Sequence, residues 1–283
     1  MRILSPRDRV RGIRPGGAEG ALRVAREDPV ANALPGARLQ QMRGSLGIGQ
    51  EFSVIGDASA PEAVLWHGVN IAPMGGQETH LLAFADHLRS RSRRASSVVG
   101  PRGPVERLWN RLEGDWGRDV REYRWSQPLL LADRPAQVAP HPRVRPAVRG
   151  EEVIVFPAAV AMFREEVGTD PLQYDEGRGY RARVRDLVVH GRTYVWIDRD
   201  GVVFKADVGA LFAGVAQIHG VWVRPDRRST GIARAAMAAV VAQVSRDHAP
   251  LVSLYVNDFN EPARRAYAAA GFRPVGELST ILF

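Results

Sequence analysis

The residues best suited to chemistry lie between a strand-like run and an alanine-rich segment, at 223–237, VRPDRRSTGIARAAM. A proline, three arginines within five residues and a glycine precede the expected start of a helix. A helix start carries unpaired backbone N–H groups and the positive end of the helix dipole. Glycine lets a ligand approach the backbone, and arginine adds forked cationic donors. The pattern predicts a cradle for an anion such as a pyrophosphate.

Other phosphate and metal motifs are absent from the sequence. No Gly-Lys-Ser/Thr follows the glycine, which excludes the P-loop, and no GxGxxG occurs, which excludes the dinucleotide fingerprint. With no cysteine, the chain has no disulfide, thiolate metal site or cysteine nucleophile. The histidine spacings form no ligand cluster, so we expect no metal.

The composition is that of a globular protein, with 283 residues, 45% of them hydrophobic and 25% charged. The net charge of +8 is almost wholly arginine, because Lys205 is the only lysine, and it is spread over both halves. A nucleic-acid-binding arm would concentrate this charge, so we expect a small polyanionic ligand and no nucleic acid. No apolar run suits a membrane span or a signal peptide, and we expect a cytoplasmic protein.

A proline-rich segment at 133–146, DRPAQVAPHPRVRP, has no apolar periodicity and predicts a domain boundary. We expect a first domain at 1–138, a linker at 139–146 and a second domain at 147–283.

A repeat relates the two halves of the chain. HGVNIAP at 67–73 matches HGVWVRP at 219–225, and in each half a helix, a strand and a second helix are expected to follow. The shared order indicates a duplication. The copies differ between the proline and the first helix, where the second has DRRSTG and the first has MGGQ without arginine.

The second half reads as mixed α/β. The segment VIVFPAAVAMFREEV predicts an amphipathic helix after a short strand near RVRPAV. TYVWID and VVFKADVGAL predict strands joined at an Asp-Gly hairpin, and GVAQIHGVWV predicts a third strand. STILF predicts the last strand of the chain.

The segment VWVRPDRRSTGIARAAM resembles the acetyl-CoA-binding motif of the GNAT acetyltransferase superfamily, Val-x-Pro followed by Arg/Gln-x-x-Gly-x-Gly/Ala. The downstream YVNDFNEPARRAYAAAGFRPVG is also similar to the family. The resemblance covers about residues 143–283. It implies that the first half is a degenerate copy of the same fold.

The resemblance implies acetyl-CoA as cosubstrate and assigns contacts to it. Its pyrophosphate would meet the backbone N–H groups of the loop and the side chains of its two adjacent arginines, and the residues involved are Arg227, Arg228, Ser229, Thr230, Gly231, Ile232 and Ala233. The strand GVWV, with Val221 and Val223, would lie beside the pantetheine arm. Backbone groups of Val223 would bind the thioester carbonyl, where an N–H stabilises an oxyanion. Both valines also suit simple core packing.

The downstream motif supplies further candidates. Tyr267 matches the tyrosine that protonates the departing thiolate in many family members, although it also suits a core aromatic. Asn260 matches a cofactor contact, but Asn260 followed by Pro262 equally suits a helix cap. Asn257 is a weaker candidate for the cofactor.

The general base is the point at which the sequence departs from the family. Gln217 stands where many members have glutamate, and an amide cannot act as a base. His219 lies two residues on, on the same face of the expected strand, and is our candidate. The repeat places His67 at the matching position, which suggests a structural role instead. Glu165 and Glu166 could line the acceptor cleft, or form a solvated helix face.

Together these features predict a tandem α/β protein, in which each half is a mixed, mostly antiparallel sheet flanked by helices. The expected reaction is acetyl transfer from acetyl-CoA to a primary amine by direct attack, with no metal. Transfer of another acyl group remains open, as does a non-catalytic acyl-CoA sensor or scaffold, which Gln217 favours. The sequence identifies neither the acceptor nor the oligomeric state.

Overall fold

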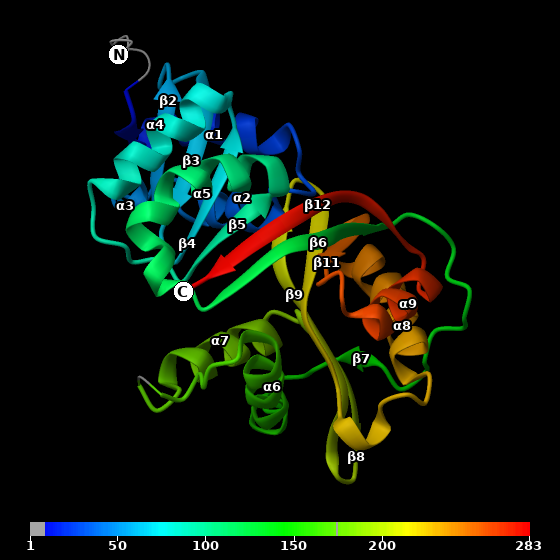
Figure 1. The fold of residues 1–283 in the computed structure, drawn as a ribbon. Helices are drawn as coiled ribbons and strands as arrows, with labels where there is room; N and C mark the ends of the chain where they lie inside the picture. Colours follow the sequence, from blue (N-terminus) through cyan, green and yellow to red (C-terminus); the bar gives the residue numbers. More distant parts are fainter. Residues whose placement is uncertain (1–8, 174) are drawn as a thin grey trace. The chain divides into compact units, whose positions relative to one another are not determined.

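The computed structural model describes residues 9–173 and 175–283. The expectation of no signal peptide concerns residues 1–8 in part, and these lie outside the described residues. The described chain divides into two compact units (Figure 1). Unit 1 holds residues up to Leu129, Tyr255–Asp258 and Pro274–Phe283, and unit 2 holds Leu130–Leu254 and Phe259–Arg273. Both units are discontinuous in sequence, and the domain bounds 1–138 and 147–283 stay a prediction.

Unit 1 is a mixed sheet with helices. Its helices are α1 (Ala18–Arg26), α2 (Ala33–Gln41), α3 (Ile48–Glu51), α4 (Glu78–Arg89) and α5 (Arg102–Trp116). Its strands, in the order in which they lie side by side, are β1 (Arg11–Gly12), β2 (Phe52–Gly56), β3 (Pro61–His67), β4 (Asn70–Gly75), β5 (Ser97–Pro101), β12 (Phe272–Leu282) and β6 (Glu122–Ala132). The chain's last strand therefore pairs antiparallel with β5.

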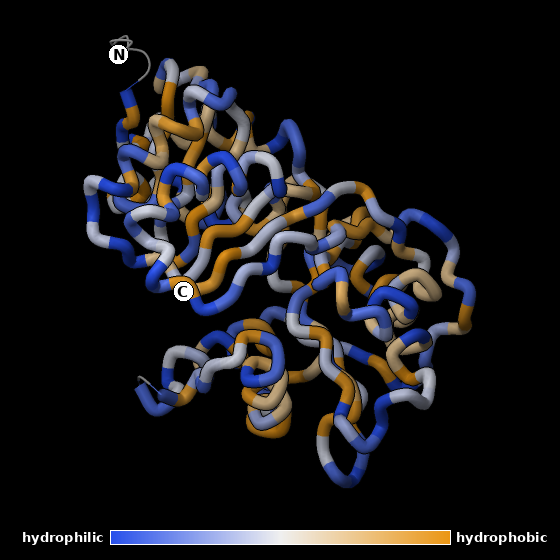
Figure 2. The backbone as a smooth tube through the Cα atoms, viewed as in Figure 1, coloured by the Kyte–Doolittle hydropathy of each residue, from blue (hydrophilic) through white to orange (hydrophobic). Residues whose placement is uncertain are grey.

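The core of unit 1 is apolar and lies where α4 and α5 cover β3, β4 and β5. It includes Phe84, Trp109 and Leu112, which are almost completely buried. Burial of side chains of this size contributes about 1.5–3 kcal/mol each. In Figure 2 hydrophilic stretches lie in the connecting loops and along parts of the helices.

Unit 2 repeats this plan. Its helices are α6 (Glu152–Val167), α7 (Arg178–Val189), α8 (Ile232–Asp247) and α9 (Glu261–Ala269). Its strands, in spatial order, are β11 (Leu251–Tyr255), β10 (Val215–Val223), β9 (Gly201–Phe212), β8 (Thr193–Asp198) and β7 (Arg145–Pro146). A core that includes Val155, Phe156 and Val195 lies between α6, α7 and the sheet.

The expected fold class is confirmed, because the two halves of the chain follow one order of elements. Three antiparallel strands lead through a helix to a parallel strand, and a second helix and a last strand follow. The two copies differ at the histidines that the repeat aligns. His219 lies inside β10, whereas His67 ends β3 and precedes the short strand β4. His67 there contacts Ser53, with Nε2 2.9 Å from Oγ.

The proline-rich segment has no helix or long strand, but it is attached to unit 2. The N–H of His141 donates to Ala235 and that of Gln137 to Ala269. Gly271, at φ +96°, lies so close to the same segment that an added Cβ would stand 2.2 Å from the carbonyl oxygen of Arg134.

We expect Gly271→Ala to destabilise the protein more than Gly214→Ala. Both glycines have a positive φ, which costs a side-chain-bearing residue about 1–2 kcal/mol. Gly214 has no atom within 4 Å of an added Cβ, whereas Gly271 meets the carbonyl of Arg134. Thermal unfolding of the two variants measures the difference, and equal midpoints would contradict the close packing of the segment.

Candidate functional site

The loop before α8 presents a row of free backbone donors. After β10 the chain makes a 3-10 turn, Pro225–Arg227, and Ser229 and Gly231 then take positive φ values of +62° and +84°. Among the described residues no acceptor faces the five successive N–H groups of Ser229, Thr230, Gly231, Ile232 and Ala233. Alternation of left-handed and right-handed residues makes successive N–H groups converge, which is an anion-binding arrangement.

The space in front of this row is open. A Cβ added at Gly231 would meet no atom within 4 Å, and residues 227–231 are exposed. The hydroxyl of Thr230 donates to the carbonyl of Arg227 at 2.7 Å and leaves the helix start uncapped. The helix therefore begins with its donors available to a ligand.

The matching helix start in unit 1 is closed. There the N–H of Gln77 donates to the ring nitrogen Nδ1 of His80 at 3.1 Å. A Cβ added at Gly76 would lie 2.7 Å from Ala63 and 3.1 Å from the same nitrogen of His80. The space that a bound anion would need is therefore filled by the unit's own side chains.

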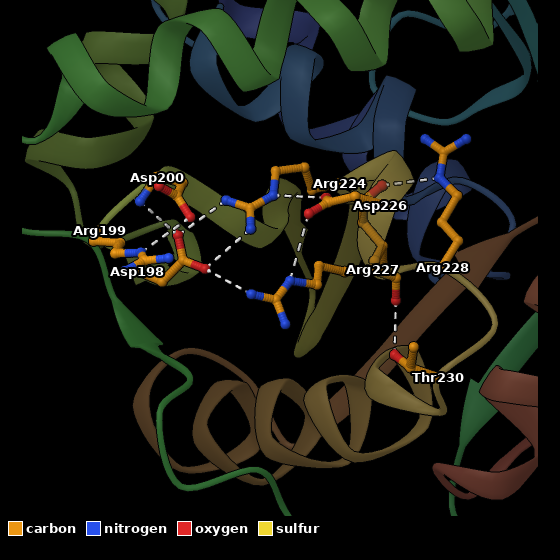
Figure 3. Close-up of polar contacts among 9 residues, drawn as sticks. Asp198, Arg199, Asp200, Arg224, Asp226, Arg227, Arg228 and Thr230 are labelled. Carbon is orange, nitrogen blue, oxygen red and sulfur yellow. Dashed lines mark hydrogen bonds and ion pairs between the residues drawn. The ribbon is translucent and has the colours of Figure 1, made fainter.

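The arginines of the loop are paired with carboxylates (Figure 3). Arg224 donates to both oxygens of Asp198 at 2.9 and 3.0 Å and to Asp226 at 2.8 Å. Arg227 lies 3.4 Å from Asp198 and 3.5 Å from Asp226. Hydrogen bonding from Arg224 lowers the pKa of Asp198, so this carboxyl stays charged. The pairs fix the loop against the β8–β9 hairpin.

Arg228 connects the loop to β10 and α6. Its Nε donates to the carbonyl of Val223 at 2.9 Å, and its Nη2 to Glu165 at 2.6 Å. The same carboxylate accepts the indole N–H of Trp222 at 3.2 Å. Glu165, one of two candidates for the acceptor cleft, thus holds the end of β10.

Arg234 is a candidate that the sequence reasoning missed. It stands in the first turn of α8, is exposed, and its side chain forms no ion pair with the described residues. A cation at a helix N-terminus is unfavourable unless an anion lies nearby. A basic residue three places after Gly231 was the available signal.

The strand β10 separates from β11 beside the loop. Parallel pairing covers Val215–Gln217 of β10, and the strand then continues to Val223 without a further partner on β11. Between His219 and Trp222 the pairing with β9 is interrupted by a bulge. Val221, expected beside the pantetheine arm, and Val223, the expected thioester contact, lie in this separated part.

Tyr267 lies on α9, and its ring contacts Phe272 with centroids 5.9 Å apart. Burial, and then the nearby Glu166, raise the pKa of its phenol. The hydroxyl forms no hydrogen bond with the described residues. Asn260 caps α9, because its Oδ1 accepts the N–H of Ala263 at 3.2 Å. Asn257 accepts from Gln127 at 2.8 Å in unit 1.

His219 and Gln217 contact each other, with Nε2 of the histidine 2.9 Å from Oε1 of the glutamine. The ring lies against Gly209, where an added Cβ would stand 2.2 Å from Nδ1. Burial, and then Arg183, lower the pKa of His219 to about 4. The imidazole is therefore neutral at pH 7.

Other features lie apart from this site. A hollow of about 520 Å³ runs along the exposed face of α7, where Arg178, Arg181 and Arg185 line it, and none of the expected site residues does. The described residues hold no cluster of His, Cys, Asp or Glu arranged as metal ligands. Within the same residues, no helix has the length and apolar character of a membrane span.

Two family models match the chain. Residues 160–272 match the acetyltransferase (GNAT) family, and residues 50–154 match a domain of unknown function, DUF4081. The C-terminal part of the chain is thus a domain of the GNAT family. No curated protein sequence matches.

Solved structures share the fold over the whole length. A GNAT-family acetyltransferase from Colwellia psychrerythraea has a TM-score of 0.61 at 10% identity, with 97% of this chain and 99% of that chain covered. A GCN5-related N-acetyltransferase from Sphaerobacter thermophilus has a TM-score of 0.57 at 17% identity, with 99% of this chain and 96% of that chain covered. A tandem GNAT protein from the clavulanic acid biosynthesis pathway has a TM-score of 0.52 at 14% identity, with 96% of this chain and 97% of that chain covered. These similar structures, together with the repeated order of elements, define a tandem GNAT-like fold.

We expect the partly buried His219 to make folding stability depend on pH. Its folded pKa of about 4 lies below the ordinary 6.5, so the unfolded chain binds more protons between these values. Stability is complete above pH 6.5 and falls toward pH 4. His219→Gln should reduce that slope, with exposed His190→Gln as the control. Urea unfolding at pH 7.5 and pH 5 measures it, and an unchanged slope contradicts the burial. His87, with a pKa of about 4, supplies a remaining slope.

Proposed function

We propose that the protein is an N-acetyltransferase that moves an acetyl group from acetyl-CoA to a primary amine, and that the site lies in unit 2. The observation that carries this proposal is the row of five unbonded N–H groups from Ser229 to Ala233, open to the surface. Such a row fits the pyrophosphate of CoA, because each N–H can donate to a phosphate oxygen.

Charge supports the same ligand. The loop cations Arg224, Arg227 and Arg228 are balanced by carboxylates in the structure, and Arg234 adds a positive charge with no ion-pair partner among the described residues. We assign Arg234 to the phosphates together with the expected Arg227 and Arg228. The helix dipole adds to this attraction.

Acetyl-CoA supplies an activated acetyl group as its thioester. Backbone N–H groups of Val221 and Val223 would hydrogen-bond the carbonyl oxygen and stabilise the negative charge that develops during amine attack. Tyr267 would give its proton to the departing sulfur. Because burial raises its pKa, this phenol keeps its proton at neutral pH. Asn260 can offer its amide N–H to the cofactor while its oxygen caps α9.

The acceptor amine must be neutral to attack, so it must lose a proton. We keep His219 as the candidate base. It is unprotonated at pH 7, but a pKa of about 4 makes it a weak base that suits a relay through water. Gln217 would orient the ring.

Two alternatives are retained. The donor could carry an acyl group other than acetyl, and the protein could bind acyl-CoA as a sensor or scaffold without catalysis. Release of free thiol from acetyl-CoA in the presence of a panel of primary amines tests the proposal. No release with any amine, together with measurable CoA binding, would favour the sensor. We also propose a cytoplasmic location.

We expect Gly231→Asp to weaken CoA binding by about tenfold or more, because its carboxylate would face the phosphates across the row of N–H groups. Gly231→Asn is the matched control. Asparagine has the same shape and tolerates the left-handed conformation, but it carries no charge. Isothermal calorimetry with CoA measures both variants. Equal affinities for the two would show that the phosphates do not bind at Gly231.

We expect Tyr267→Phe to leave CoA affinity unchanged and to slow turnover by about 100-fold, the usual scale for loss of a general acid. The phenylalanine ring keeps the packing against Phe272. Thiol release under saturating acetyl-CoA measures turnover, and calorimetry measures affinity. Turnover equal to that of the wild type would remove Tyr267 from the reaction.

A further inference from the structure

The only lysine in the chain is fully buried in the sheet of unit 2. Lys205 lies on β9 with 0% exposure, and its ammonium donates to Asp207 at 2.7 Å and to the carbonyl of Gly220 at 2.9 Å. The other oxygen of Asp207 accepts the hydroxyl of Thr193 at 2.8 Å. The network thus crosses three neighbouring strands, from β8 to β10.

The carbonyl that Lys205 holds lies in the bulge of β10. His219 pairs with Asp207 and Trp222 with Lys205, so Gly220 and Val221 together face one residue of β9. Gly220 has a φ of +56°, and an added Cβ there would stand 3.2 Å from the lysine Nζ and 2.9 Å from Cε of Met162. Glycine is therefore needed where the ammonium reaches the backbone.

This contact sets the direction of the next N–H. The described peptide bonds are all trans, so the C=O of Gly220 and the N–H of Val221 point in opposite directions from one planar unit. With the oxygen turned toward Lys205, the N–H of Val221 points away from it. The far end of the same segment is held by Arg228, which donates to the carbonyl of Val223.

A buried ion pair by itself adds little to the folding stability of a protein. Removal of a lysine and a carboxylate from water costs several kcal/mol per ion, and an apolar pair of similar volume is often as stable or more so. The ammonium does offer what an apolar side chain cannot, which is a donor directed at one carbonyl.

We propose that Lys205 is a positioning residue, which orients the Val221 N–H toward the thioester carbonyl by holding the carbonyl of Gly220. This inference rests on the proposed acyl-CoA chemistry. It adds that Asp207 acts only through the lysine, by fixing where its ammonium lies.

The test uses the full-length double variant Lys205→Met/Asp207→Asn. It removes the donor and leaves no unpaired buried charge, and the asparagine still accepts from Thr193. Isotope-edited infrared spectroscopy with carbonyl-¹³C acetyl-CoA reports the hydrogen bond directly, because a donor to the carbonyl lowers its stretching frequency. We expect a higher frequency in the variant than in the wild type. We also expect turnover about 100-fold lower, the scale for loss of one oxyanion donor, with unchanged CoA affinity.

Thr193→Val is the matched control. It removes a buried hydrogen bond from the same network but keeps the lysine on Gly220, so it should lower the unfolding midpoint without moving the carbonyl band. If the double variant does not fold, Asp207→Asn alone takes its place and should give an intermediate frequency. A carbonyl band at the wild-type frequency in the folded double variant, or in folded Asp207→Asn where that variant replaces it, overturns the positioning role. A wild-type protein that binds no CoA overturns the proposed function, and this inference with it.

Discussion

The site depends on a helix start that its own chain does not cap. Side chains of serine, threonine or aspartate normally satisfy such N–H groups, and a lost cap costs about 1 kcal/mol. The N-cap position of α8 is held by Gly231, which has no side chain to accept these N–H groups, and the hydroxyl of the preceding Thr230 donates backward to Arg227. Ser229 also takes a left-handed conformation that a non-glycine residue adopts at a cost of about 1–2 kcal/mol. Both costs are understandable if the donors serve a bound anion.

The charged side chains around this helix start have two different roles. Carboxylates of Asp198, Asp226 and Glu165 neutralise the three loop arginines, which gives the loop a fixed shape before any ligand arrives. Exposed pairs of this kind add little stability individually, but a network of them restricts the loop to one arrangement. The entropic cost of ordering the loop on anion binding would then be smaller, because the donors are already in position. Electrostatic attraction is left to the N–H groups, the helix dipole and Arg234.

Local patterns in the sequence predicted the elements well. The alternating segment TYVWID is β8, Thr193–Asp198, and the Asp-Gly pair after it forms the hairpin to β9. The open helix start was also local, since proline, glycine and arginine within a few residues announce it. Contacts between distant residues were not predictable in this way. Arg228 and Glu165 are 63 positions apart, and Lys205 reaches Gly220 only because a bulge shifts the register. The sequence repeat also aligned His67 with His219, but the structure places them on strands that do not correspond. His67 ends β3, whereas His219 lies inside β10, and β4 is shorter than β10.

The two copies of the fold differ in how far each helix start is occupied by its own chain. In unit 1 the N–H of Gln77 is bonded to His80, and a Cβ at Gly76 would collide with Ala63, so the space before α4 is already occupied by its own chain. In unit 2 the corresponding turn is longer, its donors have no acceptor among the described residues, and the space at Gly231 is empty. A phosphate at α4 would have to displace an existing hydrogen bond and side chains, whereas at α8 it would displace only water. The difference in free energy favours a phosphate at the second copy, and it follows from His80 and Ala63 together with the segments MGGQ and DRRSTG.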